Sequence, residues 1–594
     1  MNRFLFIILF CIAGFCFSQD GALAKNYYKQ GDFEKAVFYY EKLHKKYPLN
    51  TGHLFSLANC YQQLEKYDDA EKVLFSALKN TKSPILYIEI GYNYTLKENK
   101  KEAEKNYDAA LNFINENASY AYSIGTAFKK KSLLEYTVKA FELGMKLNPD
   151  FNFNYDLAYI YGEMGDIESM YNTYLNLIEY QESFMGNVQR NIGRFITDES
   201  STENNQLLKK LLLKRAQSDP NITWNQLLSW LFIQQKQYAS AFTQEKAIFK
   251  RSEEPSLERI TELGIIALQE KDNTTAKSIF EYLIDVSGDP ELIIQSHLYI
   301  ININLEEGES TKKLNSVEEK FTSLLSKYGY STETINLQIA YANFLAFHKE
   351  QPQKAQNLLK EILKEKINRY DEANVKMALA DILVYDEKFN QALIFYSQIQ
   401  KTVKNDVIAQ NARFKVAQTS FYKGDFDWAE TQLKVLKSST SQLIANDALQ
   451  LKLLISDNSL EDSTQTALKI YAKADLLSYQ NKDDKAIELL NEILINHKGE
   501  SIEDEALLKQ AKLFEKKKEY EKARFNYIKI IEFYNNGILA DDALFYLAEL
   551  YSNPLNTHNE AKELYEKIIF NHPDSIFFIE AQKQYRRLRG DAIN

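Results

Sequence analysis

A small residue that recurs at nearly constant spacing is the feature that most constrains the fold of this 594-residue chain. Ala36, Ala70 and Ala103 are 34 and 33 residues apart, and apolar residues around each fall three or four positions apart. That spacing places the apolar residues on one face of a helix. Polar pairs such as Gly31-Asp32 separate two such runs, which predicts two helices joined by a short turn. One helix pair cannot bury its apolar face alone, so successive units are predicted to stack.

The residue types inside each unit resemble those of tetratricopeptide repeats. A small residue is followed three positions later by an aromatic one, and an alanine twelve positions further has an aromatic residue or leucine at its +4 position. One unit shows the full pattern: Gly91, Tyr94, Ala103 and Tyr107. The resemblance is close over residues 20–180 and departs at Thr137 and Met170, which replace the alanine. It implies an all-α fold, a superhelix of about a dozen helix-turn-helix repeats.

The repeats become longer toward the end of the chain. Ala486, Ala523 and Ala561 are 37 and 38 residues apart, which indicates longer helices or turns. Over roughly residues 465–590 the sequence resembles the repeats of bacterial outer-membrane assembly and envelope-coordination proteins. Asp541 to Ala548 and His572-Pro573-Asp574-Ser575 carry that second resemblance.

The regularity of the repeats divides the chain into segments. We expect a signal peptide at 1–18, a regular array at 19–183, divergent repeats at 184–335, middle repeats at 336–465, and C-terminal repeats with a capping helix at 466–594. Polar stretches interrupt the pattern at 197–205, 305–316 and 456–465. They are hinges between solenoid arms or long surface turns.

The N-terminus is typical of an exported protein. Arg3 precedes mostly apolar residues from Phe4 to Phe17, a run shorter than the roughly 20 residues that span a bilayer. Cleavage after Ser18 fits a secretory signal peptide. Lipidation is an alternative, although phenylalanine precedes both cysteines of this segment. The mature chain keeps only Cys60, which excludes an internal disulfide and indicates a packing role.

Charge and motif content argue against several function classes. Formal net charge is −10 with no long basic block, so nucleic acid is not expected as a partner. The seven histidines show no metal-ligand spacing, and no phosphate loop or nucleophile motif is present. Ser310 and Lys313 form an isolated Ser-x-x-Lys without its partner motifs. We therefore expect no catalytic, cofactor-binding or metal site, and no enzyme activity.

The resemblance to tetratricopeptide repeats also implies a binding groove. In that family the first helices of successive units line a concave surface. The corresponding positions here are Phe55, Asn59, Tyr92, Tyr122, Thr126, Tyr155 and Tyr159. Such a row of aromatic, amide and hydroxyl groups suits a peptide or an amphipathic helix, and rings also suit sugar faces. The alternative is that several of these rings are inter-repeat packing.

The sequence thus predicts a non-catalytic protein-interaction scaffold in the bacterial cell envelope, supporting assembly, transport or wall-related complexes. Its partners would be other envelope proteins or peptides, in the periplasm or at the outer membrane. Peripheral membrane association remains open, and no mature segment is apolar enough to span a bilayer. One alternative is a helical repeat protein that binds glycan or peptidoglycan. An enzyme with an unrecognised site is another, although no segment outside the helical pattern is long enough to house it.

Overall fold

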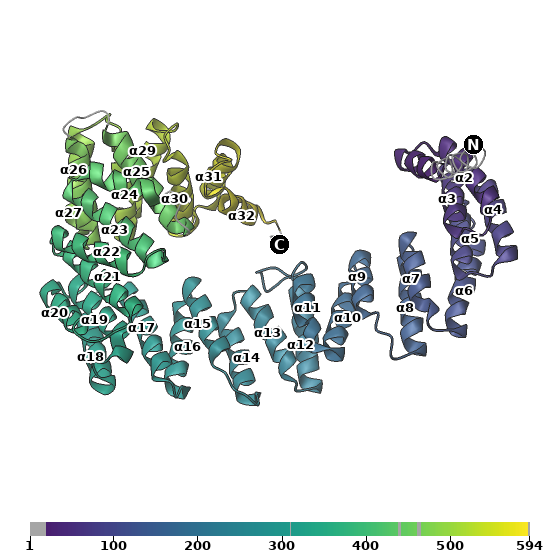
Figure 1. Cartoon of the computed structure of the whole chain (residues 1–594), viewed down its shortest axis with the longest axis horizontal. Coiled ribbons are helices and arrows are strands. Elements are labelled where there is room, and N and C mark those ends of the chain that lie inside the picture. Colours follow the sequence, from purple (N-terminus) through teal and green to yellow (C-terminus); the bar gives the residue numbers. More distant parts are fainter. Residues whose placement is uncertain (1–19, 309, 437–440, 460–464, 592–594) are drawn as a thin grey trace, which may run out of the picture. The chain divides into compact units, whose positions relative to one another are not determined.

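The computed structural model describes residues 20–308, 310–436, 441–459 and 465–591. Within these ranges the chain is helical and contains no strand, which confirms the predicted all-α repeat fold (Figure 1). The expected signal peptide lies outside the described residues. The chain forms two compact units, Met1–Trp224 and Asn225–Asn594. This division falls within the segment expected to hold divergent repeats, and the other segment boundaries stay predictions.

Unit 1 is a series of consecutive antiparallel helices. Residues 20–30 are helical. The helices that follow are α2 (Phe33–Lys46), α3 (Thr51–Gln63), α4 (Tyr67–Asn80), α5 (Pro84–Leu96), α6 (Lys100–Glu116), α7 (Tyr120–Lys130), α8 (Leu134–Leu147), α9 (Asn154–Met164), α10 (Ile167–Tyr180), η1 (Glu182–Phe184), α11 (Met185–Ile192) and α12 (Glu203–Ser218). Helix α13 (Ile222–Gln234) begins at the division.

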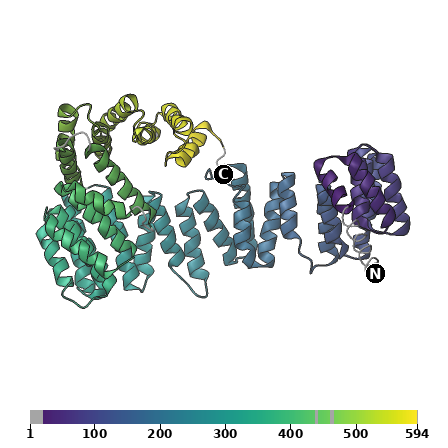
Figure 2. The same ribbon diagram turned by 45° about the horizontal axis from the view of Figure 1, so that its top comes forward.

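Unit 2 continues with the same kind of helix pair, and Figure 2 shows the stacking within each unit from a second direction. Its helices are α14 (Tyr238–Arg251), α15 (Glu258–Gln269), α16 (Asn273–Val286), α17 (Pro290–Glu306), α18 (Thr311–Tyr328), η2 (Thr332–Thr334), α19 (Ile335–Phe347), α20 (Pro352–Ile362), α21 (Arg369–Tyr385), α22 (Phe389–Thr402), α23 (Val407–Lys423), α24 (Phe426–Leu436), α25 (Gln442–Ser459), α26 (Thr466–Tyr479), α27 (Asp483–Asn496), α28 (Glu503–Lys516), α29 (Tyr520–Phe533), α30 (Ala540–Ser552), α31 (His558–Asn571) and α32 (Phe578–Arg589). Helix α32 lies where the sequence predicts the capping helix.

Glycines in the first helix of a repeat admit an aromatic ring from the second helix. A Cβ atom on Gly125 would lie 2.4 Å from the ring of Phe141, and one on Gly91 would lie 2.5 Å from the ring of Tyr107. Both rings are buried. The signature alanines Ala36, Ala70 and Ala103 are likewise buried. Small residues therefore set how closely the two helices pack, as the sequence predicted.

In several repeats a tyrosine hydroxyl of the first helix bonds to the preceding repeat. Tyr94 of α5 donates a hydrogen bond to Glu71 of α4 at 2.9 Å, and Tyr161 of α9 donates to Glu142 of α8 at 2.7 Å. Burial, with the hydrogen bond to Glu71 and its charge, raises the pKa of Tyr94 to about 12. These hydroxyls stay protonated at neutral pH and keep donating, so the tyrosines link repeats besides filling space.

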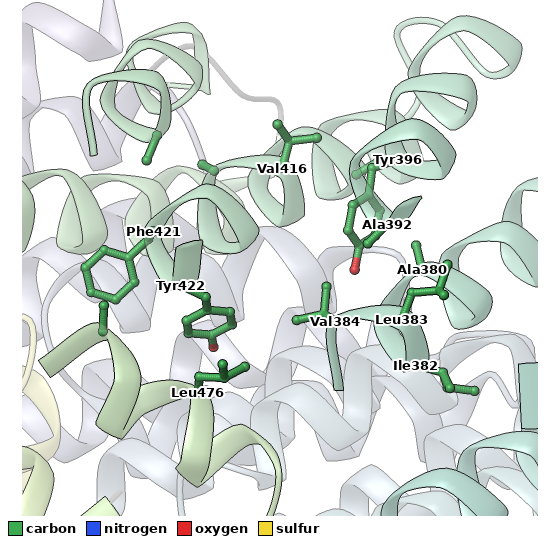
Figure 3. Packing of buried hydrophobic residues seen from close by; sticks show 14 of the residues in the cluster. Ala380, Ile382, Leu383, Val384, Ala392, Tyr396, Val416, Phe421, Tyr422 and Leu476 are labelled. Carbon is green, nitrogen blue, oxygen red and sulfur yellow. The ribbon is translucent and has the colours of Figure 1, made fainter. Parts of the chain in front are cut away.

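The core of unit 2 includes a contact between helices far apart in sequence. After α25, helix α26 packs back on α23, and Figure 3 shows Tyr422 of α23 facing Leu476 of α26. The Tyr479 hydroxyl donates to the carbonyl of Asp381 at 3.1 Å. The buried amide of Gln480 donates to the carbonyl of Tyr385 at 2.8 Å. This packing interrupts the regular order of helix pairs around residues 442–479.

The expected polar interruptions contain more helix than the sequence indicated. Helix α18 begins at Thr311, so most of 305–316 is helical, and α12 begins at Glu203 inside 197–205. Ser310 is the N-cap of α18 and accepts a hydrogen bond from the backbone N–H of Lys313, which accounts for the spacing of this serine and lysine. No helix in the part of the chain that the structure describes is long and apolar enough to cross a membrane.

Candidate docking surface

The predicted groove residues all lie on first helices of unit 1. Phe55 and Asn59 belong to α3, Tyr92 to α5, Tyr122 and Thr126 to α7, and Tyr155 and Tyr159 to α9. These seven residues are called the first-helix surface below. They divide into two groups, because three are exposed and four are half-buried.

The exposed group consists of tyrosines. The side chains of Tyr122, Tyr155 and Tyr159 are 57%, 47% and 49% exposed, which is enough for a partner to cover a large apolar area. Tyr122 also stacks on Phe141 and Phe153 at ring-centroid distances of 6.3 and 6.2 Å. Each ring is thus anchored on α7 or α9 and still open to solvent.

Two members of the half-buried group, Asn59 and Tyr92, lie beside Lys131, which sequence analysis did not single out. Lys131 caps the C-terminus of α7, and its Nζ donates to Asn59 Oδ1 at 2.9 Å. The same Nζ lies 2.8 Å from Glu89 Oε2 and 4.5 Å from the centre of the Tyr92 ring. One ammonium group therefore connects α3, α5 and α7. It brings together Asn59 and Tyr92 of the predicted set, whereas Phe55 packs with the apolar residues around Leu54.

The ion pair of Glu89 and Lys131 is largely removed from water. The Glu89 and Lys131 side chains are only 9% and 11% exposed. Burial raises the pKa of Glu89, and the charge and hydrogen bond of Lys131 act in the opposite direction. A carboxylate in such a place needs its partner, because an unpaired buried charge is costly. The pair consequently holds α5 against the end of α7, the helix that carries Tyr122.

A cation also lies beside the exposed tyrosines. Lys129 of α7 places its Nζ 4.3 Å from the centre of the Tyr159 ring on α9. This contact is a cation–π interaction and holds the ring toward α7. The first-helix surface can therefore offer rings, a ring-bound ammonium and the half-buried Thr126 hydroxyl to a binding partner.

Unit 2 contains a hollow of about 680 Å³ between α16, α17 and α18, lined partly by His297 and Lys320. Burial and the charges of Lys320 and Lys327 lower the pKa of His297 to about 4. The pKa of Lys320 is lowered by burial and by the charge of Lys327. His297 is accordingly uncharged at neutral pH. The walls mix apolar, acidic and basic groups, so no single ligand chemistry follows from them.

The described ranges contain many His, Asp and Glu side chains and one cysteine, Cys60, which are the residue types that bind metals or act as nucleophiles. No group of three or more His, Cys, Asp or Glu side chains there is arranged to hold a metal ion. Cys60 is buried, and burial raises the pKa of its thiol to about 12, so the reactive thiolate is scarce at neutral pH. This environment agrees with the packing role expected for Cys60.

Comparison with protein families identifies the repeat type at both ends of the chain. A family model described as "Tetratricopeptide repeat" matches residues 505–536 and 542–575, which cover α28 to α31. These repeats are of the tetratricopeptide type. A model described as "Anaphase-promoting complex, cyclosome, subunit 3" matches residues 21–77, in the first tetratricopeptide-like pairs of unit 1. No curated protein matches the chain.

Two solved structures of protein complexes contain similar helical arrays. One is "Structure of Naa15/Naa10 bound to HypK-THB", with 13% identity, a TM-score of 0.27, and 96% of each chain covered. Another is "Crystal structure of APC/C hetero-tetramer Cut9-Hcn1", with 12% identity, a TM-score of 0.24, and 96% of this chain and 95% of that chain covered. Such low scores carry no argument about function, so the tetratricopeptide assignment rests on the repeats themselves.

Proposed function

We propose that this chain is a protein-binding scaffold of the bacterial cell envelope, and that the first-helix surface of unit 1 is its docking site. Three exposed tyrosines on α7 and α9 carry the proposal, together with a buried ion pair that holds α7 against α5. Tetratricopeptide repeats are typically non-catalytic interaction modules. The apolar N-terminal run of residues 4–17 supports export.

Tyrosine is well suited to such a surface for a physical reason. Its ring offers a large rigid contact area, and its hydroxyl adds a hydrogen bond, while little conformational entropy is lost on binding. Hot spots of protein interfaces are enriched in tyrosine for that reason. An extended segment or an amphipathic helix of an envelope protein is the kind of partner that this row of rings would accept.

The proposal can be tested by crosslinking in cells followed by purification of the tagged full-length chain from envelope fractions. We expect mass spectrometry to find a defined set of envelope proteins. The double variant Tyr122→Glu/Tyr155→Glu should lose them, because two buried charges would oppose docking. Tyr180→Glu is the matched control, since Tyr180 is 62% exposed but lies at the end of α10, a second helix.

Two results would contradict this function. Equal loss of partners in Tyr180→Glu and in the double variant would show that the first-helix surface is not the docking site. Recovery of no protein, with retention of the chain on purified cell wall or polysaccharide, would favour glycan binding instead.

A further inference from the structure

A second surface, on unit 2, carries a concentration of positive charge around the turn between α22 and α23. Two hollows of about 400 Å³ each meet at this turn and share Lys404 and Asn405. One also includes Arg413 of α23, and the other includes Arg369 of α21 and Lys401 of α22. These four cations and the two hollows are called the α22–α23 surface.

The charge of this surface is not neutralised from within. Among the lining residues, Asp406 supplies the carboxylate, and its Oδ1 accepts the backbone N–H of Ile408 as a helix cap. None of the four cations forms an ion pair with another described residue. By contrast, the neighbouring Lys388 lies 2.7 Å from Asp386, and Lys415 lies 3.3 Å from Asp381. These four cations therefore form a local positive charge in a chain whose formal net charge is −10.

Two of the cations are held in place by uncharged groups. The Nε of Arg413 donates to Gln400 Oε1 at 3.1 Å. The guanidinium of Arg369 lies 4.8 Å from the centre of the Tyr370 ring, and its Nη2 donates to the Tyr370 hydroxyl at 3.1 Å. A guanidinium has five N–H donors in a planar fork, so most donors of both arginines stay available. The surface is thus partly pre-organised for carboxylates.

We propose that the α22–α23 surface binds an acidic segment of a partner protein, whose Asp and Glu carboxylates pair with these four cations. Apolar groups flank the charges: Tyr370 and Val435 line the two hollows, and their side chains are 42% and 54% exposed. A peptide offers carboxylates and apolar side chains together, which matches both features. Nucleic acid fits less well, since its phosphates continue along the strand beyond the four cations and would meet the negative charge of the rest of the chain, whereas a short acidic segment can end within the surface.

This surface lies in a different unit from the first-helix surface, so the inference does not depend on the proposed function. Fluorescence anisotropy of a fluorescein-labelled deca-glutamate peptide with the full-length chain tests it. We expect saturable binding that weakens as salt is raised from about 0.05 to 0.3 M, because salt screens exposed charges. Lys401→Glu/Lys404→Glu should lower the affinity at least about tenfold, equivalent to about 1.4 kcal/mol. Lys401→Gln/Lys404→Gln should cause a smaller loss.

The matched control reverses two exposed lysines elsewhere in unit 2. Lys364→Glu/Lys522→Glu changes the net charge by the same amount, and these lysines are 67% and 64% exposed in local ion pairs. Equal loss in both charge-reversed variants, or no binding of deca-glutamate, would overturn the proposal. Binding of polyphosphate or of phosphatidylglycerol vesicles, but not of the peptide, would also overturn it. Tyr122→Glu should leave peptide binding unchanged, which separates this result from the test of the first-helix surface.

Discussion

At the scale of residues, a glycine in the first helix of a repeat determines how closely the second helix can pack against it. The relation seen at Gly91 and Gly125 recurs at Gly264 of α15, where an added Cβ atom would lie 3.0 Å from the ring of Phe280. In each case the ring stands sixteen positions after the glycine. Dispersion contacts are short-ranged, so a shift of one methyl group in such a place changes stability.

We predict that Gly125→Ala destabilises unit 1. The new Cβ would lie 2.4 Å from the buried ring of Phe141, and overpacking of this kind costs about 1–3 kcal/mol. The higher helix propensity of alanine relative to glycine offsets up to about 1 kcal/mol of this cost. Urea unfolding measures the net effect. Gly186→Ala in α11 is the control, because nothing lies within 4 Å of its added Cβ and it should be neutral or slightly stabilising. Equal stability of the two variants would refute this account of Gly125.

The small residues and their aromatic partners could be predicted because the same spacing recurs in successive repeats. The alanines and glycines of the first helices, and their aromatic partners, follow from spacing alone. Lys131 did not, since its partner Asn59 is 72 residues away and nothing in the run Lys129-Lys130-Lys131 distinguishes one lysine from the next. Glu89 was missed for the same reason. The positions of the predicted surface residues on first helices follow from the repeat pattern, whereas the exposure of each side chain depends on packing across repeats.

At the scale of elements, one buried ammonium determines how three helices are held together. We predict that Lys131→Met costs about 3–5 kcal/mol, because it leaves the Glu89 carboxylate buried without a partner. The double variant Glu89→Gln/Lys131→Met should cost less than the single one. Lys130→Met is the control, since Lys130 is adjacent and exposed. Chemical unfolding of the four proteins provides the comparison.

The loss of folding stability in Lys131→Met should depend on pH. Burial already raises the pKa of Glu89, and removal of the lysine takes away an effect that lowers it. The folded state of the variant therefore binds a proton more tightly than the unfolded state, so stability should rise as pH falls through that raised pKa. A loss that is the same at all pH values would mean that Lys131 acts through packing and not through charge.

Element order was less predictable than element type. The repeat pattern anticipated helix pairs up to α24 and again from α26 to α31. It did not anticipate that α26 packs back on α23, or that Tyr479 and Gln480 donate hydrogen bonds to carbonyls of α21 that lie 98 and 95 residues earlier. Contacts at that separation leave no local signal in the sequence. Irregular joints of a repeat array are accordingly where sequence reasoning is weakest.

At the scale of the whole molecule, stability is shared among separate cores. The core that contains Ile88 to Ala140 and the core that contains Leu507 to Ala581 have no residue in common, and they lie in different units. In repeat proteins each unit contacts its neighbours, so stability is approximately a sum of local terms. A local change should then have a local effect, in contrast to a compact domain that unfolds as one block.

Hydrogen exchange followed by mass spectrometry of the full-length Gly125→Ala variant measures this directly. We expect faster amide exchange in α5 to α8, which pack around Gly125 and Phe141, and unchanged exchange in α28 to α31. The reason is that the substitution raises the free energy of the folded state only where its contacts are made. Gly186→Ala again serves as control and should leave both regions unchanged. Faster exchange in all helices together would mean that the two units unfold cooperatively. A substitution at the first-helix surface would then also change the stability of the α22–α23 surface, and the reverse.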